Sequence, residues 1–304
     1  MTDLAEVVEL LEVEQLDAGL FRGSQPEARP PRVFGGQVLA QGLRAAGRTV
    51  PDGRLPHSLH AYFIRPGHCR TLIVYDVSRL RDGGSLSVRR VSAIQDGEVI
   101  CDITCSFAEP REAVASRWEA PVVDGPDELP DVAARLTAYA AELDGWWVRE
   151  RPFDMRPLDP PPRAALDELD DPAVIDPVSR LWLRADGPVP NDALLHTCLL
   201  TYASDMILLE PVLVARRTTT LGPGSVASLD HAMWFHRTPD IAEWHLYDRR
   251  VVGEAARRGL ASGRLFTRAG DLVATVNQEG YLSPHDPRDW AGPRLRAPDR
   301  TATS

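Results

Sequence analysis

Asp205 is the residue whose position in this sequence most clearly suggests chemistry, because it is a carboxylate near the end of an otherwise apolar helix. Residues 191–208, NDALLHTCLLTYASDMIL, place apolar side chains on nearly every side of the predicted helix, and such a helix is buried. Burial and the negative end of the helix dipole both disfavour a charged carboxylate, so both raise its pKa toward the working range of a general base. The alternative is that the helix end emerges into solvent and Asp205 is simply hydrated.

The composition excludes several classes of chemistry. All 34 Lys and Arg residues are Arg, so no lysine can form a Schiff base with pyridoxal phosphate or serve a Walker motif. An anionic ligand must therefore be held by arginine or by backbone N–H groups. The formal net charge of -10 is spread along the chain without a basic stripe, which argues against nucleic-acid binding.

Two further features concern the compartment. Residues 1–17 are acidic where a signal peptide would be basic, and no apolar run is expected to reach the length of a membrane span. The cysteines, Cys69, Cys101, Cys105 and Cys198, lack CxxC spacing and lie in apolar segments, which is typical of reduced core thiols rather than of disulfides or a zinc site. We therefore expect a cytoplasmic protein that binds no metal and does not insert into a membrane.

The first third of the chain predicts one helix packed on an antiparallel sheet. Residues 35–49, GGQVLAQGLRAAGRT, form a predicted buried helix that opens with two glycines. Runs rich in β-branched and aromatic residues predict strands at 57–66, 72–80, 85–95 and 98–110, with a fifth at 13–23. Gln95-Asp96-Gly97 is a hairpin signal between the last two of the four.

A proline-rich segment then separates two similar halves. Residues 110–190 contain recurrent prolines and an acidic cluster at 167–171, which is linker composition, with one helical segment at 131–144 and a strand at 179–186. The predicted regions are an N-terminal half (1–115), a Pro-rich linker with a short helix (116–178), a C-terminal half (179–284) and a loose C-terminal tail (285–304).

The second half repeats the first. Residues 35–49 align without gaps on 191–205, and in the same order LHAYFIRP corresponds to DHAMWFHRTP, VYD to LYD, and QDGEVICDITCSF to RAGDLVATVNQEGY. Each half reads as a β-α-β-β-β-β unit whose antiparallel sheet wraps around one buried helix. The predicted fold is therefore α+β, a double hotdog.

At these motifs the chain resembles the acyl-CoA thioesterase II (TesB-type) family, and the resemblance covers nearly all of the chain except the tail. The motifs are FGGQVLAQGL, HSLHAYFIRPG, YDVSRLRDGGSLSVRRVSAIQ, LLTYASDM, LDHAMWFHR and VATVNQEG. The resemblance implies hydrolysis of acyl-CoA to a free acid and CoA by water, with no cofactor, metal or prosthetic group. It also implies a homo-oligomer, a dimer or tetramer of double hotdogs.

The family's catalytic Asp, Thr and Gln fall on Asp205, Ser228 and Gln278, as the resemblance implies. Serine replaces the family's threonine, so the hydroxyl is kept while the methyl group that restricts its rotamer is lost. Asp205 would take a proton from water, and the other two side chains, which can each donate and accept, would orient that water.

Strand alternation places these two orienting side chains on definite faces. Gln278 is expected to share a face with Ala274 and Val276, and Ser228 to share one with Ala232 and Trp234. The small apolar face under Gln278 would let its long amide reach a helix that packs on it.

The helix that opens at Gly35 offers donors for a substrate carbonyl. The free N–H groups of Gly35, Gly36 and Gln37 could stabilise negative charge on the carbonyl oxygen if the two halves meet face to face. The alternative, equally compatible with the sequence, is that these glycines only allow close packing of helix and sheet.

The alignment of the halves predicts a single working site per chain. Asp205 aligns with Thr49, Gln278 with Cys105, and Ser228 falls near His57. Threonine cannot act as a base near neutral pH, and a thiol cannot replace an amide that donates and accepts. The first half is therefore expected to contribute a wall of the pocket rather than a second site.

Histidine chemistry is a weaker alternative. His57, His60 and His231 could suggest it, and Asp230-His231 could suggest a hotdog hydratase or dehydratase. Adjacent strand residues point to opposite faces, so Asp230 and His231 cannot easily cooperate. We interpret these histidines as hydrogen-bonded residues of the core or of an interface.

Other readings remain. No GxSxG nucleophile elbow occurs, which argues against a serine hydrolase. A non-catalytic acyl-CoA binding or sensing protein could use the same fold, but it would gain nothing from a buried carboxylate. Arg249-Arg250 and Arg257-Arg258 could contact CoA phosphates, although arginines on exposed strands are usually just solvated.

Overall fold

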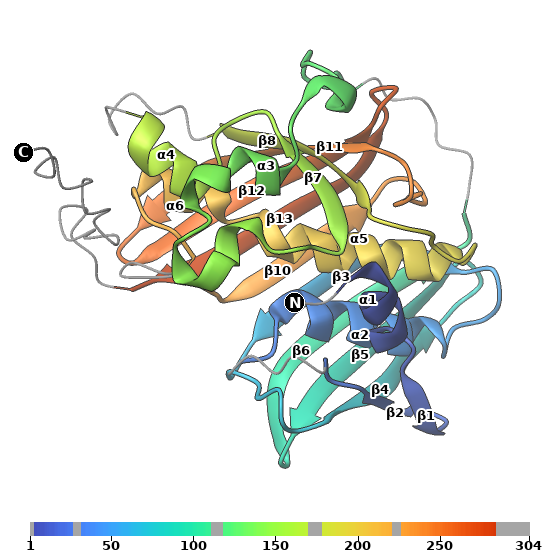
Figure 1. Ribbon diagram of the computed structural model, residues 1–304. Helices are drawn as coiled ribbons and strands as arrows, with labels where there is room; N and C mark the ends of the chain where they lie inside the picture. The colour runs from blue at the N-terminus through green and yellow to red at the C-terminus, as the bar shows by residue number, and fades with distance from the viewer. Residues whose placement is uncertain (1–2, 27–31, 111–117, 170–177, 221–225, 284–304) are drawn as a thin grey trace, which may run out of the picture.

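The structure is a computed structural model that describes residues 3–26, 32–110, 118–169, 178–220 and 226–283. Within these residues all 13 strands belong to one antiparallel sheet, in the order β1-β2-β4-β5-β6-β3-β10-β13-β12-β11-β8-β7, with β9 beside β13. Figure 1 shows the first half, in blue to cyan, against the second half, in yellow to red, with the helices α2 and α5 side by side between them.

The first half contains the helix that the glycine pair opens. It comprises α1 (Leu4–Leu10), β1 (Glu14–Asp17), β2 (Leu20–Gly23), α2 (Gly35–Gly47), β3 (Leu55–Phe63), β4 (Ile73–Asp82), β5 (Leu86–Gln95) and β6 (Glu98–Ala108). The predicted helix and the four strands that follow it are confirmed. The single strand expected at 13–23 was wrong, because the chain turns at Ala18-Gly19 and forms a hairpin of two short strands.

The second half repeats the order of a strand, a helix and four strands, with α6 and β9 inserted after the helix. It comprises β8 (Val178–Ala185), α5 (Ala193–Ile207), α6 (Glu210–Ala215), β9 (Val226–Ser228), β10 (Asp230–Phe235), β11 (His245–Ala255), β12 (Arg258–Thr267) and β13 (Leu272–Leu282). Strand order β4-β5-β6-β3 in one half meets β10-β13-β12-β11 in the other, so the halves are joined edge to edge through β3 and β10. The double hotdog that the repeat predicted is confirmed.

The segment between the halves is folded where the structure describes it. It contains η1 (Pro126–Glu128), α3 (Val132–Arg135), η2 (Thr137–Tyr139), η3 (Leu143–Val148), β7 (Phe153–Pro157) and α4 (Pro162–Glu168). The helical segment expected over 131–144 is helical only in part, because Leu136 and Glu142 leave helical φ and ψ values and divide it into α3 and short 3-10 turns. A buried ion pair between Glu142 and Arg163 stabilises this segment together with its own small hydrophobic cluster.

One hydrophobic core spans both halves. Leu39 and Leu43 of α2 and Leu195 and Leu199 of α5 are buried members of the same cluster. Gly47 permits the close approach of the two helices, since a Cβ there would lie 2.5 Å from the Leu194 side chain. The four cysteines are buried and free, as expected.

The buried helix is apolar enough to resemble a membrane span. Taken together, α5 and α6 cover the 23 residues Ala193–Ala215, which meet the length and composition of a span. The expectation that no run reaches this length was therefore wrong. Most of the segment is nevertheless buried inside the protein, as in the core helix of a globular fold.

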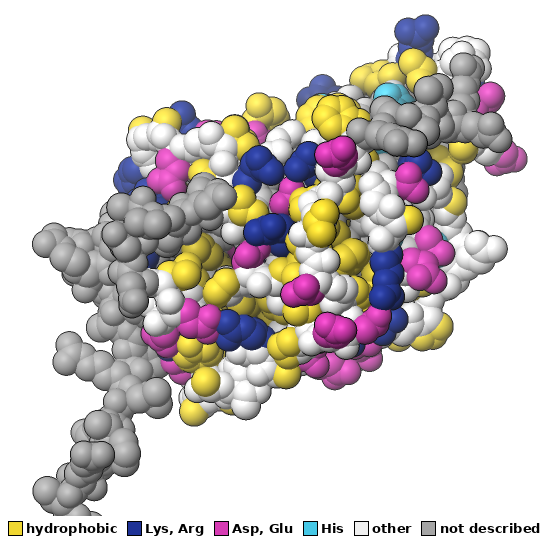
Figure 2. All heavy atoms as spheres, turned by 90° about the horizontal axis from the view of Figure 1, so that it is seen from above, with side chains coloured by type: hydrophobic (Ala, Val, Ile, Leu, Met, Phe, Trp, Pro, Cys, Tyr) yellow, Lys and Arg dark blue, Asp and Glu magenta, His cyan; other side chains and the backbone are white. Residues whose placement is uncertain are grey.

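Charges on the surface are mixed. On the face shown in Figure 2, arginine and acidic side chains are interspersed among hydrophobic ones, and positive charge does not gather into a stripe. The predicted tail, residues 285–304, lies outside the described residues.

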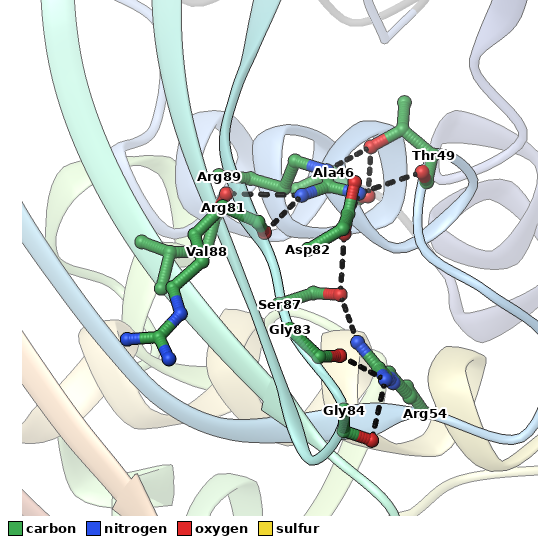
Figure 3. A network of polar contacts seen from close by, with 10 residues as sticks. All are labelled: Ala46, Thr49, Arg54, Arg81, Asp82, Gly83, Gly84, Ser87, Val88 and Arg89. Atoms are coloured by element: carbon green, nitrogen blue, oxygen red, sulfur yellow. Dashed lines mark hydrogen bonds and ion pairs between the residues drawn. The ribbon is translucent and has the colours of Figure 1, made fainter.

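A buried arginine fixes the end of α2 in the first half (Figure 3). The Arg89 side chain is fully buried, and its Nε donates to Thr49 Oγ1 at 2.8 Å. Its Nη2 donates to the Thr49 carbonyl at 2.9 Å and to Asp82 Oδ1 at 2.7 Å. A cation just beyond the C-terminus of a helix also complements the negative end of the helix dipole.

We expect Arg89→Met to lower the free energy of unfolding by about 1–3 kcal/mol, because it leaves the buried Thr49 groups without their donors. The neighbouring Arg90 is the matched control, since it forms an exposed ion pair with Asp102, and Arg90→Met should leave stability unchanged. Urea unfolding followed by circular dichroism measures both. Equal effects of the two substitutions would show that the buried network does not stabilise the fold.

Candidate active site

Asp205 lies in the last turn of α5 and is buried. The helix begins at a capped N-terminus, where Asp192 Oδ1 accepts from the N–H groups of Leu194 and Leu195, and its apolar faces insert it between the sheet and α2. Only 3% of the Asp205 side chain is exposed. Burial raises the pKa of the Asp205 carboxyl, while His231, Gln278 and the Gly36 N–H act in the opposite direction. The hydrated helix end considered as an alternative is therefore wrong.

Gln278 connects Asp205 to Ser228. It lies on the buried face of β13 with Ala274 and Val276, as strand alternation predicted, and all three are fully buried. Its amide Nε2 donates to Asp205 Oδ1 at 2.7 Å and to Ser228 Oγ at 2.7 Å. The structure thus brings the three sequence-predicted side chains into one hydrogen-bonded group.

A one-residue bulge precedes β10. Ser228 pairs with Gly280, whereas Ala232 pairs with Asn277, so three residues between Ser228 and Ala232 lie opposite two residues of β13. Such a bulge breaks the alternation of side chains along the strand and is used near active sites to re-aim a residue. The sequence carries no obvious sign of the extra residue.

The bulge corrects the predicted face of Ser228. Ser228 points toward Gln278 on the inner side of the sheet, whereas Trp234 is exposed and makes an edge contact with the ring of His60. The expectation that Ser228 shares a face with Ala232 and Trp234 was therefore wrong. Without the bulge the Ser228 hydroxyl would face away from Asp205.

The N-terminus of α2 meets the Asp205 carboxylate. A Cβ at Gly35 would lie 2.8 Å from Asp205 Oδ2, and the Gly36 N–H forms a hydrogen bond that lowers the pKa of Asp205. Phe34, the N-cap residue, makes no side-chain capping bond, so the first N–H groups of this helix are not capped by Phe34. The two halves therefore meet at the site through α2 and α5.

Close packing also requires the second glycine. A Cβ at Gly36 would lie 2.7 Å from the Tyr202 carbonyl oxygen and closer still to the Phe34 ring. The side chain of Gln37 turns away, since its Nε2 donates to the Ser24 carbonyl and to Gln25 Oε1. Only the backbone N–H of Gln37, and not its side chain, is therefore available at the N-terminus of α2.

His231 is also a member of this group, and its interpretation as a hydrogen-bonded core residue is confirmed, although its position beside Asp205 was not predicted. It is fully buried, with Nδ1 3.8 Å from Asp205 Oδ1 and Nε2 3.0 Å from Ser204 Oγ. Burial lowers the pKa of His231. As expected, Asp230 does not cooperate with it, because Asp230 Oδ1 accepts from the Glu279 N–H. The signal that could have revealed His231 is its alternation with the buried Met233 on the inner face of β10.

The first half has no equivalent group among the described residues. The hydroxyl of Thr49 is held by Arg89 and by the Ala46 carbonyl, and His57 Nε2 lies 2.8 Å from Ser106 Oγ. Cys105 is buried, which raises the pKa of its thiol. These side chains supply no carboxylate base.

The arginine pairs differ in their availability. Arg249 is buried and donates to Glu210, to the Ile207 carbonyl and to Ser179, so the suggestion that it could contact a CoA phosphate was wrong. Arg250 is exposed, and Arg257 and Arg258 lie on the solvent side of the β11–β12 turn.

Comparisons with known proteins agree with this architecture. Residues 172–281 match the family model described as acyl-CoA thioesterase, and residues 25–108 match that of the acyl-CoA thioesterase N-terminal domain. The chain is 34% identical to acyl-CoA thioesterase 2 of Haemophilus influenzae, covering 92% of this chain and 97% of that protein. It is 33% identical to human acyl-coenzyme A thioesterase 8, covering 91% and 88%.

A solved structure is similar over the same length. It is that of an acyl-CoA thioesterase II from Mycobacterium marinum, with 35% identity, a TM-score of 0.73, and coverage of 92% of this chain and 99% of that one. Both halves and the segment between them are thus matched together. The chain belongs to the acyl-CoA thioesterase II (TesB-type) family, as its motifs predicted.

Proposed function

We propose that this enzyme hydrolyses acyl-CoA thioesters to a free carboxylic acid and CoA, with water activated by Asp205 and oriented by Ser228 and Gln278. The observation that carries the proposal is the bridge from Gln278 Nε2 to both Asp205 Oδ1 and Ser228 Oγ. It holds a buried carboxylate in one orientation beside the start of a helix from the other half. Membership of the family supports the class of substrate.

The residues suit attack by water. A thioester carbonyl is electrophilic enough that a polarised water is a sufficient nucleophile. Asp205 takes a proton from that water, and its raised pKa gives it the proton affinity that a general base needs. Ser228 accepts from Gln278 through its oxygen, so its own O–H remains free to hold the water in line with the carbonyl.

The helix start supplies the other half of the chemistry. Negative charge develops on the carbonyl oxygen as water adds, and the N–H groups of Gly35, Gly36 and Gln37 begin a helix whose positive end faces the site. In this proposal the N–H groups of Gly35 and Gln37 are the oxyanion donors, while the Gly36 N–H holds the Asp205 carboxylate beside the bound substrate. The close packing that the glycines also permit brings these donors near Asp205.

Release of thiol from a panel of acyl-CoAs tests the function directly. Continuous formation of free CoA, detected with a thiol reagent, is the expected result. Tight binding of acyl-CoA without thiol release would favour a binding or sensing protein, and a change in the acyl chain without thiol release would favour a hydratase or dehydratase.

We further predict a cytoplasmic homo-oligomer, a dimer or tetramer.

Replacing the base should abolish turnover. We expect Asp205→Asn to lower kcat by roughly two to four orders of magnitude, because the amide cannot accept a proton from water. In the parent enzyme, kcat/KM should fall as the pH drops through the raised pKa of Asp205, above the range of an ordinary carboxyl at about 4. Near-normal hydrolysis by the variant would contradict the assignment.

The stability of Asp205→Asn shows whether a loss of activity is due to unfolding. The raised pKa means that the folded state binds the Asp205 proton more tightly than the unfolded state does, so the parent loses stability as the pH rises through that pKa. Asp205→Asn lacks this loss and should be at least as stable as the parent at neutral pH. Urea unfolding at acid and neutral pH checks the sign.

Substitutions at Ser228 separate the hydroxyl from its surroundings. We expect Ser228→Ala to lower kcat by less than Asp205→Asn does, because the base remains, and Ser228→Thr to keep activity, because it restores the family's residue with its hydroxyl. Steady-state kinetics of both variants provide the measurement. Parent activity in the Ala variant together with an inactive Thr variant would show that the hydroxyl does not hold the water.

A further inference from the structure

We propose that His231 is the proton partner of Asp205, and that its Nδ1 receives the proton that Asp205 removes from water, so that the pair rather than Asp205 alone acts as the base. The inference rests on the proposed function and adds a positioning residue that acts through Asp205. It starts from a buried polar atom that the mechanism above leaves unused. His231 Nδ1 has no hydrogen-bond partner among the described residues and faces Asp205 Oδ1 across 3.8 Å.

Ser204 fixes which nitrogen of His231 carries the proton. The Ser204 hydroxyl donates to the Thr201 carbonyl at 2.8 Å, one turn back in α5. With its hydrogen on that carbonyl, the Ser204 oxygen can only accept from His231 Nε2 at 3.0 Å, and we infer that Nε2 is the protonated nitrogen of the neutral ring. Nδ1 is therefore left with a free lone pair on the side of Asp205.

Neutral His231 with its proton on Nε2 leaves two buried atoms without partners. They are His231 Nδ1 and Gln278 Oε1, both acceptors when the ring is neutral. Gln278 and Asp205 each raise the pKa of His231 against the opposing effect of burial, which shows that both side chains face the ring. A proton on Nδ1 turns it into a donor that can bond to Gln278 Oε1 or to Asp205 Oδ1, so the protonated ring satisfies the atoms that the neutral ring does not.

The proton can be followed through the whole reaction. As water adds to the carbonyl carbon, one O–H bond breaks and its proton passes to Asp205 and then to Nδ1, which leaves a carboxylate beside an imidazolium. The C–S bond then breaks, and the CoA sulfur leaves with the electron pair. The pair returns its proton to that sulfur, so the site ends with neutral His231 and ionised Asp205.

The transfer needs only a small movement. The 3.8 Å between Nδ1 and Oδ1 exceeds a direct hydrogen bond by about 1 Å. The charged or titratable groups that face His231 are Asp205 from α5 and Asp230 from its own strand, and Gln278 of β13 contributes a neutral amide. The carboxylate of Asp230 is engaged by the Glu279 N–H, so Asp205 is the group positioned to exchange a proton with the ring.

Two substitutions of His231 separate proton uptake from packing. Glutamine can keep the bond to Ser204 through its terminal amide, and asparagine can keep a polar group where Nδ1 lies, but neither can take up a proton. We expect both variants to lower kcat by roughly 100-fold or more while KM changes by less than about threefold. The matched control is His245→Asn, which removes another buried histidine, bonded to the Glu243 carbonyl, and should leave kcat unchanged.

The pH profile is a readout that a purely structural role would not alter. Without a proton acceptor beyond Asp205, hydroxide must increasingly replace activated water, so log kcat of His231→Asn should rise by about one per pH unit above neutrality, where the parent levels off. If the His231 variants fail to fold, Ser204→Ala tests the same point. It keeps the imidazole but releases its tautomer, and kcat should fall severalfold with unchanged affinity for a non-hydrolysable acyl-CoA analogue.

The outcomes are distinguishable. Parent kcat and a parent pH profile in His231→Gln, or in Ser204→Ala, would overturn the inference while leaving the proposed function intact, provided that Asp205→Asn is inactive. Failure of the unmodified enzyme to release thiol from any acyl-CoA would instead overturn the proposed function. Equal losses in His245→Asn and His231→Asn would also contradict the inference, because any buried histidine would then have the same effect.

Discussion

The burial of the Asp205 carboxylate against the N-terminus of α2 is the interaction on which the rest of the structure depends. A charged group with 3% of its side chain exposed is tolerated only if polar partners surround it. The Gly36 N–H approaches from one half, and the Gln278 amide approaches from the other. Because these partners come from both halves, the site exists only when the halves are docked as the continuous sheet docks them.

The C-terminal ends of α2 and α5 are equivalent in the duplicated fold but have different roles. In the second half the last turn of α5 carries Asp205, which the Gln278 amide orients. In the first half the aligned residue is Thr49, and the fully buried Arg89 occupies its hydroxyl and carbonyl. One helix end is thus stabilised by a cation for structure, while the other holds an anion at a cost in stability that is consistent with a catalytic role. In the proposed mechanism the first half contributes donors and a wall in place of a second base.

The sequence predicted those features that depend on patterns along one element. The apolar helix around Asp205, the glycine pair at the start of α2, the repeat and the buried face of Gln278 all follow from periodicity or alignment, and the structure agrees with them. Features that depend on pairing between distant strands were missed. The bulge that turns Ser228 inward appears only when its strand is laid on β13.

Two other misses have the same physical origin. The sequence argument correctly excluded cooperation between the neighbours Asp230 and His231. It did not predict that His231 faces Asp205, which lies on the helix packed against the sheet. Arg249, treated as a surface residue, is drawn inward by Glu210 and the end of α5. The positions of His231 and Arg249 both depend on which side chains a helix presents to the sheet. The residue pattern of a strand alone does not identify the helix residue that will contact it.

We propose that the two halves form a single hydrolytic site per chain. Calorimetric titration of the protein with a non-hydrolysable acyl-CoA analogue measures the number of sites directly, and hydrolysis by Asp205→Asn measured alongside assigns them. We expect about one analogue bound per chain and essentially no residual hydrolysis in the variant. Two bound analogues per chain with half of the activity retained would contradict it, because the first half would then be an independent catalyst.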